Sequence, residues 1–267
     1  MNNQSDTNKN IIKKPSNEDI GKFLEKYKGT ISKALPKNLT ADKVLRIALT
    51  EIRRNPKLLE CNKTSLVAAI VQSAQLGLAP DSLTGYAYLI PYKDQCQFQI
   101  GYKGMMRLAY NSGQVINITA QAVYNDDIFE FEYGLKPTLK HIPSSTGSRD
   151  ESELKWVYAI AYLKNGGTAY VVLTKKDVLW HQSFSSSRSS KYSPWTTAFI
   201  EMAKKTAIRS LCKYLPMSAE DNSLQTAIVL DEQAERGEQK NEEIFEGEMV
   251  DLESNEKTSF ADEVAGG

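Results

Sequence analysis

The stretch that decides the fold is PDSLTGYAYLIPYKDQCQFQIGYKGMMRLAYNSGQVINITAQAVY, residues 80–124. Aromatic and apolar side chains alternate with a period of two along residues 86–92, which predicts a strand. Lys93-Asp94 provides a turn, and residues 95–100 alternate again, so these two segments are expected to form a hairpin. A short helix and a further strand complete the stretch. The centre of the chain is therefore predicted to be antiparallel sheet with one short helix.

The sequence before this stretch has helical periodicity. Apolar residues recur at three- and four-residue spacing in three segments, about residues 17–35, 40–55 and 64–77. Thr40 and Thr64 are suitable N-caps for the second and third segments. The N-terminal third is therefore predicted to be a group of helices.

The sequence after residue 124 continues with strands and then returns to helices. The expected order is strands at 128–133, 155–163 and 168–173, a helix from Thr174 through Trp180, a flexible serine-rich loop at 183–194, a long helix from Pro194 to about Leu215, and a helix from Ser218 through Leu230. The predicted class is α+β, with a helical N-terminal part, a central antiparallel sheet and a long basic C-terminal helix.

The charges are unevenly distributed along the chain. The whole sequence has 33 basic and 33 acidic residues, but residues 231–267 contain 13 acidic and 3 basic ones, which leaves 30 basic and 20 acidic residues in 1–230. A basic body with an acidic tail is typical of proteins that handle nucleic acid, and a merely solubilising terminus is the alternative. We expect a flexible arm at 1–16, one core at 17–230 and a disordered acidic tail at 231–267.

Several classes of protein are not indicated. No apolar run is long enough to cross a bilayer and the N-terminus lacks a signal peptide, so a cytoplasmic protein without a membrane partner is expected. No glycine begins a P-loop, and two histidines and three scattered cysteines form no metal motif, so no cofactor and no metal are expected. A Mg²⁺-dependent nuclease would have to use Asp81 and Glu153, which look like a turn residue and part of a charged run.

Basic residues interleaved with aromatic ones form the strongest functional pattern. Lys205, Arg209 and Lys213 follow one another at four-residue spacing on the long C-terminal helix, about 6 Å apart, which approaches the phosphate spacing of an extended single strand. A solvated helix face would give the same pattern. The segment before this helix contains Arg188, Lys191, Tyr192 and Trp195.

A second basic and aromatic group lies at the start of the short central helix. Lys103 and Arg107 are four residues apart beside Tyr102. Gly101 and Gly104 give this segment a Gly-x-x-Gly form, which lets a backbone approach phosphates at a helix start. Both groups are therefore candidates for nucleic-acid binding.

Several motifs together resemble the RecT family of bacteriophage and prophage single-strand annealing recombinases. They are QLGLAP at 75–80, YLIPY at 88–92, IGYKG at 100–104 and PWTTAFIEMAKKTAIRSLCKYLP at 194–216, in that order, within a resemblance that covers about residues 20–225. The N-terminal arm and the acidic tail lie outside it.

The resemblance implies a protein that is not an enzyme and needs no ATP. It implies binding to single-stranded DNA, assembly into rings or helical filaments, and pairing of complementary strands into duplex during phage recombination. It also implies two partners, a 5′-to-3′ exonuclease and the host single-strand binding protein. By the same resemblance, the residues that line the DNA groove are Lys103, Arg107, Lys205, Arg209 and Lys213. A passive single-strand coat protein would use the same residues.

Overall fold

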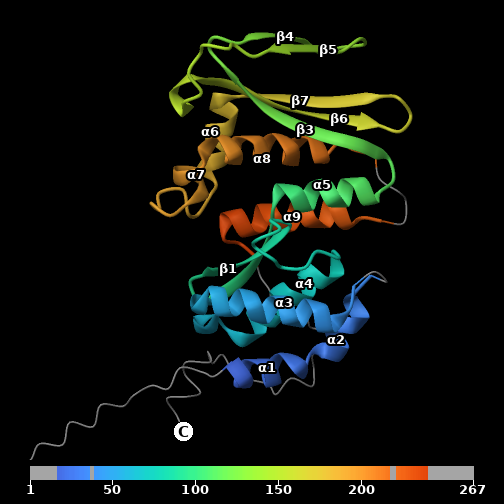
Figure 1. The fold of residues 1–267 in the computed structure, drawn as a ribbon, viewed down its shortest axis with the longest axis vertical. Coiled ribbons are helices and arrows are strands. Elements are labelled where there is room, and N and C mark those ends of the chain that lie inside the picture. The colour runs from blue at the N-terminus through green and yellow to red at the C-terminus, as the bar shows by residue number, and fades with distance from the viewer. Residues whose placement is uncertain (1–16, 37–38, 217–220, 240–267) are drawn as a thin grey trace, which may run out of the picture. The chain divides into compact units, whose positions relative to one another are not determined.

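The computed structural model describes residues 17–36, 39–216 and 221–239, and these divide into two compact units (Figure 1). The first unit contains residues 17–80 and Leu89–Gln97, and the second contains Asp81–Tyr88 and Phe98–Gln239. Each unit has its own buried residues. The predicted arm at 1–16 and most of the predicted tail lie outside the described residues.

The first unit is built mainly of helices, as predicted. They are α1 (Asn17–Glu25), α2 (Lys28–Ala34), α3 (Ala41–Arg54), the 3-10 helix η1 (Pro56–Glu60) and α4 (Lys63–Gln75). Helix α4 is the centre of the unit, because its residues from Lys63 to Ala74 are buried with few exceptions. Its N-cap is Asn62, whose side-chain oxygen accepts hydrogen bonds from the N–H groups of Thr64 (2.8 Å) and Ser65 (3.3 Å). The predicted cap, Thr64, lies inside the helix instead.

Strands β1 (Ala87–Tyr92) and β2 (Gln95–Ile100) form the predicted hairpin, and their residues are shared between the two units. Lys93 adopts the left-handed conformation in the turn, with φ of 55°. At the tip, the N–H of Cys96 donates to the hydroxyl of Ser65 (2.8 Å), and the N–H of Asn62 donates to the carbonyl of Asp94 (2.6 Å). These bonds fix the tip of the hairpin to the start of α4 within the first unit.

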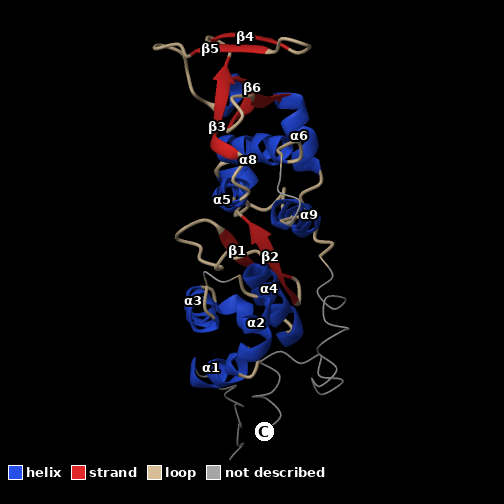
Figure 2. Cartoon of the chain, turned by 90° about the vertical axis from the view of Figure 1, so that its right-hand side faces the viewer, coloured by secondary structure: helices blue, strands red, loops and turns tan. Residues whose placement is uncertain are grey.

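The second unit has a three-stranded antiparallel sheet in the order β3-β6-β7, made of β3 (Val115–Tyr124), β6 (Leu154–Leu163) and β7 (Thr168–Thr174). Helix α8 (Phe199–Cys212) packs against all three strands on one face, together with α6 (Lys175–Ser183). The hairpin of β4 (Ile128–Glu132) and β5 (Thr138–Ile142) lies over the other face (Figure 2). Helices α5 (Tyr102–Asn111) and α9 (Ser223–Arg236) pack beyond α8 and against each other.

The α+β class is confirmed, while several element boundaries differ from the prediction. The first predicted helix is divided into α1 and α2, and the long one into α7 (Pro194–Thr197) and α8 at Ala198, whose φ of −149° is not helical. Strand β5 was not predicted. Helix α9 begins at Ser223 and continues to Arg236, six residues beyond the predicted end, and the predicted cap Ser218 lies outside the described residues.

Aromatic rings and a tyrosine hydroxyl join the β4–β5 hairpin to the sheet. Phe129 stacks on Tyr158, with ring centroids 5.5 Å apart, and Tyr133 stacks on Tyr170 at 5.2 Å. The hydroxyl of Tyr133 also accepts a hydrogen bond from the N–H of Val172 on β7 (2.9 Å). The hairpin therefore covers the face of the sheet that α8 leaves open, and it contacts the backbone of the edge strand.

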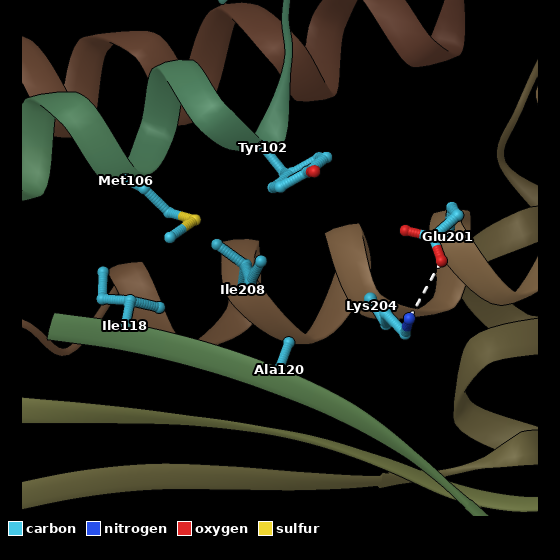
Figure 3. A pocket seen from close by; sticks show the side chains of 7 residues that line it. All are labelled: Tyr102, Met106, Ile118, Ala120, Glu201, Lys204 and Ile208. Carbon is cyan, nitrogen blue, oxygen red and sulfur yellow. Dashed lines mark hydrogen bonds and ion pairs between the residues drawn. The ribbon is translucent and has the colours of Figure 1, made fainter. Parts of the chain in front are cut away.

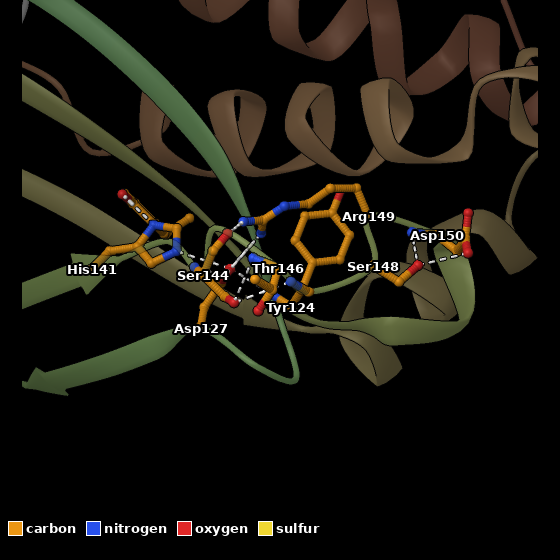
Figure 4. Close-up of polar contacts among 10 residues, drawn as sticks. Tyr124, Asp127, His141, Ser144, Thr146, Ser148, Arg149 and Asp150 are labelled. Atoms are coloured by element: carbon orange, nitrogen blue, oxygen red, sulfur yellow. Dashed lines mark hydrogen bonds and ion pairs between the residues drawn. The ribbon is translucent and has the colours of Figure 1, made fainter.

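Asp127 fixes the start of this hairpin. Its buried carboxylate accepts hydrogen bonds from the N–H groups of Tyr124 (2.8 Å) and Ser144 (2.7 Å) and from Arg149 (2.9 Å), and it lies 3.1 Å from Nε2 of His141 (Figure 4). Burial alone would raise the pKa of this carboxyl, but its hydrogen bonds hold the pKa well below the usual range. A charged Asp127 is therefore part of the folded state.

We predict that Asp127→Asn lowers the free energy of unfolding by about 2 kcal/mol at pH 7. Because the folded state has the lower pKa, the contribution of Asp127 is present above the ordinary value of 3.8 and is lost as the pH falls below it. Urea unfolding should show a smaller difference between the variant and the wild type at pH 3 than at pH 7, because the unfolded carboxyl is largely protonated at pH 3. The exposed neighbour Asp126, changed to Asn, is the control and should have little effect. A pH-independent difference would contradict this role.

Candidate nucleic-acid interface

The two glycines of the IGYKG motif allow α5 to touch the segment before β1. A Cβ atom on Gly101 would lie 2.1 Å from the carbonyl oxygen of Gly85, and one on Gly104 would lie 2.2 Å from that of Tyr86. The N–H of Gly101 also donates to the carbonyl of Tyr86 (3.0 Å). The Gly-x-x-Gly form predicts space for a phosphate, whereas in the structure the backbone of Gly85 and Tyr86 fills this space.

We predict that Gly104→Ala lowers the free energy of unfolding by about 2–3 kcal/mol, because the added methyl group can be accommodated only by moving backbone. Gly29→Ala in α2 is the matched control, since nothing lies within 4 Å of a Cβ there and alanine favours a helix. Chemical unfolding of both variants checks this, and an equal response would show that α5 is not packed this closely.

The three predicted binding residues of α5 differ in exposure. Tyr102 is half-buried and lines a cleft, and Lys103 is exposed. The guanidinium of half-buried Arg107 lies over the ring of Tyr86, 5.0 Å from its centroid. A cation over an aromatic face is stabilised by the ring and held in place. The start of α5 therefore brings together two cations and two aromatic rings.

Lys205 and Arg209 do not form the open basic face that their spacing indicated. Only 8% of Lys205 and 4% of Arg209 is exposed. The amine of Lys205 is 2.8 Å from one carboxylate oxygen of Asp231, and Arg209 is 3.0 Å from the other and also bonded to Glu235. The predicted face is wrong because α9 covers it with Asp231 and Glu235, which lie in the predicted acidic tail.

Between α8 and α9, opposite charges stabilise the ionised forms of Arg209 and Glu235. Burial by itself would lower the pKa of Arg209 and raise that of Glu235. The neighbouring opposite charges reverse both effects, so the pKa of Arg209 is raised and that of Glu235 is lowered. Arg209 and Glu235 therefore remain ionised at neutral pH. At the end of the same stripe, Lys213 is exposed and pairs with Glu232 at 2.6 Å.

The segment before α8 contains both exposed and buried members of the predicted set. Lys191 and Tyr192 are exposed, with the amine 4.9 Å from the ring centroid, and Arg188 is exposed and donates to the carbonyl of Ser183. Trp195 is only 3% exposed, and its indole N–H donates to Glu235 (3.1 Å). Trp195 therefore belongs to the core and is not available to stack on a base.

Sequence reasoning missed an exposed aromatic pair at the end of α6. Trp180 is 59% exposed, and its ring makes an edge contact with Phe184 at 4.6 Å. Arg236 lies over the ring of Phe184 at 5.2 Å, and Arg188 is held nearby through Ser183. We call Trp180, Phe184, Arg188 and Arg236 the aromatic–basic patch. Its signal in the sequence is the four-residue spacing of Trp180 and Phe184 immediately before the serine-rich segment.

The two carboxylates that a nuclease would need have structural partners. One carboxylate oxygen of Asp81 accepts from the N–H of Leu83 (3.0 Å) within a turn. Glu153 accepts from the side-chain amide of Asn125 (2.7 Å). Among the described residues, no group of three or more His, Cys, Asp and Glu side chains is arranged to hold a metal ion.

No described helix is long and apolar enough to span a membrane.

Comparison with known proteins now gives the family. The model of the RecT family matches residues 42–245. The chain belongs to the RecT family. It is 43% identical over 226 residues to Protein RecT of Escherichia coli (strain K12), covering 81% of each chain. It is also 30% identical over 202 residues to the uncharacterized protein YqaK of Bacillus subtilis (strain 168), covering 73% of this chain and 67% of that protein.

The extent of the RecT match agrees with the structure of the C-terminal region. The match continues to residue 245 and so includes the whole of α9, with Asp231 and Glu235. The resemblance read from motifs ended near residue 225. The RecT region therefore includes the carboxylates that neutralise Lys205 and Arg209.

We predict that Arg209→Ala lowers the free energy of unfolding by about 3–5 kcal/mol, because it leaves the carboxylates of Asp231 and Glu235 buried with fewer partners. Lys213→Ala, which breaks a partly exposed ion pair between the same two helices, is the matched control and should cost at most about 1 kcal/mol. Urea unfolding of both variants measures the difference. Similar small losses would place Arg209 on a solvated surface.

Proposed function

We propose that this chain binds single-stranded DNA through its second unit and pairs complementary strands without a nucleotide cofactor. Membership of the RecT family supports a role in recombination and strand annealing. The observation that carries the proposal is that cations lie over aromatic rings at two places, half-buried Arg107 at the start of α5 and exposed Arg236 in the aromatic–basic patch. Such pairs bind single strands of any sequence, because phosphates meet the cations and bases meet the rings.

In this proposal, some of the candidate residues contact DNA and others stabilise the fold. Lys103 and Arg107 on α5, and Lys213 at the end of α8, bind phosphates. Arg188, Lys191, Tyr192 and the aromatic–basic patch extend this surface. Lys205 and Arg209 act indirectly, because their charges are already paired with α9. Tyr102 contacts a base.

The mechanism requires no covalent step, so the protein is not an enzyme. Lysine and arginine displace counterions from the strand, which provides affinity independent of sequence. Bases that remain accessible test a second strand for complementarity. When they match, base stacking of about 1.4 kcal/mol per step stabilises the duplex, so no nucleotide hydrolysis is needed. The protein supplies local concentration and alignment.

Assembly and partners complete the proposal. Subunits associate head to tail into rings or helical filaments, so that the DNA surface continues from one subunit to the next. In the cytoplasm, a 5′-to-3′ exonuclease exposes the strand, and the host single-strand binding protein hands it over during phage recombination. There are two alternative functions. A passive single-strand coat protein would use the same residues, and a Mg²⁺-dependent nuclease would use Asp81 and Glu153.

The deciding experiment follows annealing of two complementary labelled oligonucleotides with the full chain, without ATP, together with a gel of the products. Faster annealing with intact strands supports the proposal. Binding without acceleration would favour the coat protein. Strands shortened only in the presence of Mg²⁺ would favour the nuclease.

We predict that Lys103→Ala weakens binding to all single-strand sequences alike and reduces the slope of log affinity against log salt by about 0.7. Lys140→Ala is the control, because this lysine is exposed on the β4–β5 hairpin and pairs with Glu130. Fluorescence anisotropy at several salt concentrations measures both slopes. An unchanged slope for Lys103→Ala would remove this residue from the DNA surface.

Two C-terminal truncations both remove acidic residues, but only the longer one also removes part of α9. Removal of residues 240–267 eliminates nine acidic and two basic residues, so binding to single-stranded DNA is expected to tighten severalfold at low salt while thermal stability is retained. A chain ending at Leu230 also loses Asp231 and Glu235 and is expected to be strongly destabilised. Anisotropy and thermal unfolding distinguish them. Weaker binding by a folded chain ending at Gln239 would contradict the expectation.

A further inference from the structure

A cleft of about 190 Å³ lies within the second unit, between α5, α8 and β3 (Figure 3). Four of its seven lining residues are apolar. Met106 comes from α5, Ile118 and Ala120 from β3, and Ile208 from α8. Ile118 and Ile208 are buried and form the floor, while Met106 and Ala120 are half-buried and can be reached from outside. The cleft therefore favours an apolar or aromatic surface.

The polar groups of the cleft carry no net charge. Glu201 and Lys204 lie on one side and form an ion pair of 2.9 Å, and the ring of Tyr102 extends from α5 on the other (Figure 3). A paired carboxylate and amine give little attraction for a phosphate. They do offer one hydrogen-bond acceptor and one donor, and the tyrosine hydroxyl offers both. Apolar walls with a few convergent polar groups fit a neutral, planar heteroaromatic ring.

The cleft also lies beside a phosphate-binding residue of the proposed DNA surface. Tyr102 is followed directly by exposed Lys103 at the start of α5. A strand whose phosphates are bound at Lys103 would pass the opening that Tyr102 lines. A nucleobase is the heteroaromatic ring that such a strand carries at every step.

We propose that this cleft receives one unstacked nucleobase of the bound single strand, between Tyr102 and the Glu201–Lys204 pair. The inference rests on the proposed function, since it assigns a subsite to the same surface. A base in duplex is stacked and paired, so it could enter only after losing both interactions, which disfavours binding of duplex here. The cleft thus distinguishes single strand from duplex, and the base must leave it before the strand can anneal at that position.

The test combines a substitution that fills the cleft with an oligonucleotide that lacks bases. Ala120→Leu places extra carbon atoms in the cleft, and Gln121→Leu, an exposed neighbour on the opposite face of β3, is the matched control. The full chain is titrated with an oligothymidylate and with an oligonucleotide of equal length whose residues are all abasic. The measured quantity is the ratio of the two dissociation constants, abasic over thymidylate.

We expect this ratio to fall about tenfold in Ala120→Leu and to remain at the wild-type value in Gln121→Leu. Tyr102→Ala provides a second variant, because the side chain is half-buried and its removal should lower the same ratio. Circular dichroism verifies that each variant is folded. The preference for single strand over duplex should decrease in the same two variants.

Two results would overturn the inference. If Ala120→Leu and Tyr102→Ala bind with the wild-type ratio, the base does not enter the cleft, although the proposed function stands as long as the oligonucleotides are bound. If the wild type binds neither oligonucleotide, the proposed function fails, and the base site fails with it.

Discussion

The second unit depends on Asp231, a buried carboxylate that binds Lys205 and Arg209 of α8 at once. Removing either side of this cluster would leave a buried charge without an opposite one, which costs about 3–5 kcal/mol. The same helix supplies Glu235 to Arg209 and to the indole of Trp195. Helix α9 therefore determines how α7 and α8 are placed, although it lies at the end of the core.

Backbone contacts extend this dependence to the serine-rich segment and to the central hairpin. The N–H of Ser186 donates to the carbonyl of Glu235 (2.9 Å), which fixes the start of that segment. The side chain of Gln239 bonds to both the N–H and the carbonyl of Phe98 on β2, at 2.9 and 3.1 Å. Helix α9 thus helps to place exposed Arg188, two residues beyond Ser186. The same helix contributes Arg236 to the aromatic–basic patch.

The sequence predicted the class and most elements because their signals are local. Alternation along residues 86–100 and helical spacing before residue 77 need no knowledge of the rest of the chain. The failures have non-local causes. Charge counting separated residues 231–236 from the core, since a run of acids looks like a solvated tail until the buried cations opposite it are known. Likewise, the spacing of Lys205 and Arg209 is the same whether they face DNA or another helix. Trp195 is buried and donates a hydrogen bond to Glu235, whereas Trp180 is exposed. No local sequence pattern predicts which of these two tryptophans is buried.

The hydroxyl of Tyr133 occupies a backbone hydrogen-bonding position at one edge of the sheet. Strand β7 is an edge of its sheet, and edge strands are the usual place where a second chain adds a strand of its own. At Val172 the outward N–H is already bonded to Tyr133, and the β4–β5 hairpin is stacked against the same strand through Tyr170. A strand from another chain could pair with β7 at Val172 only by displacing the Tyr133 hydroxyl, so extension of the sheet at this edge is opposed by the protein's own hairpin.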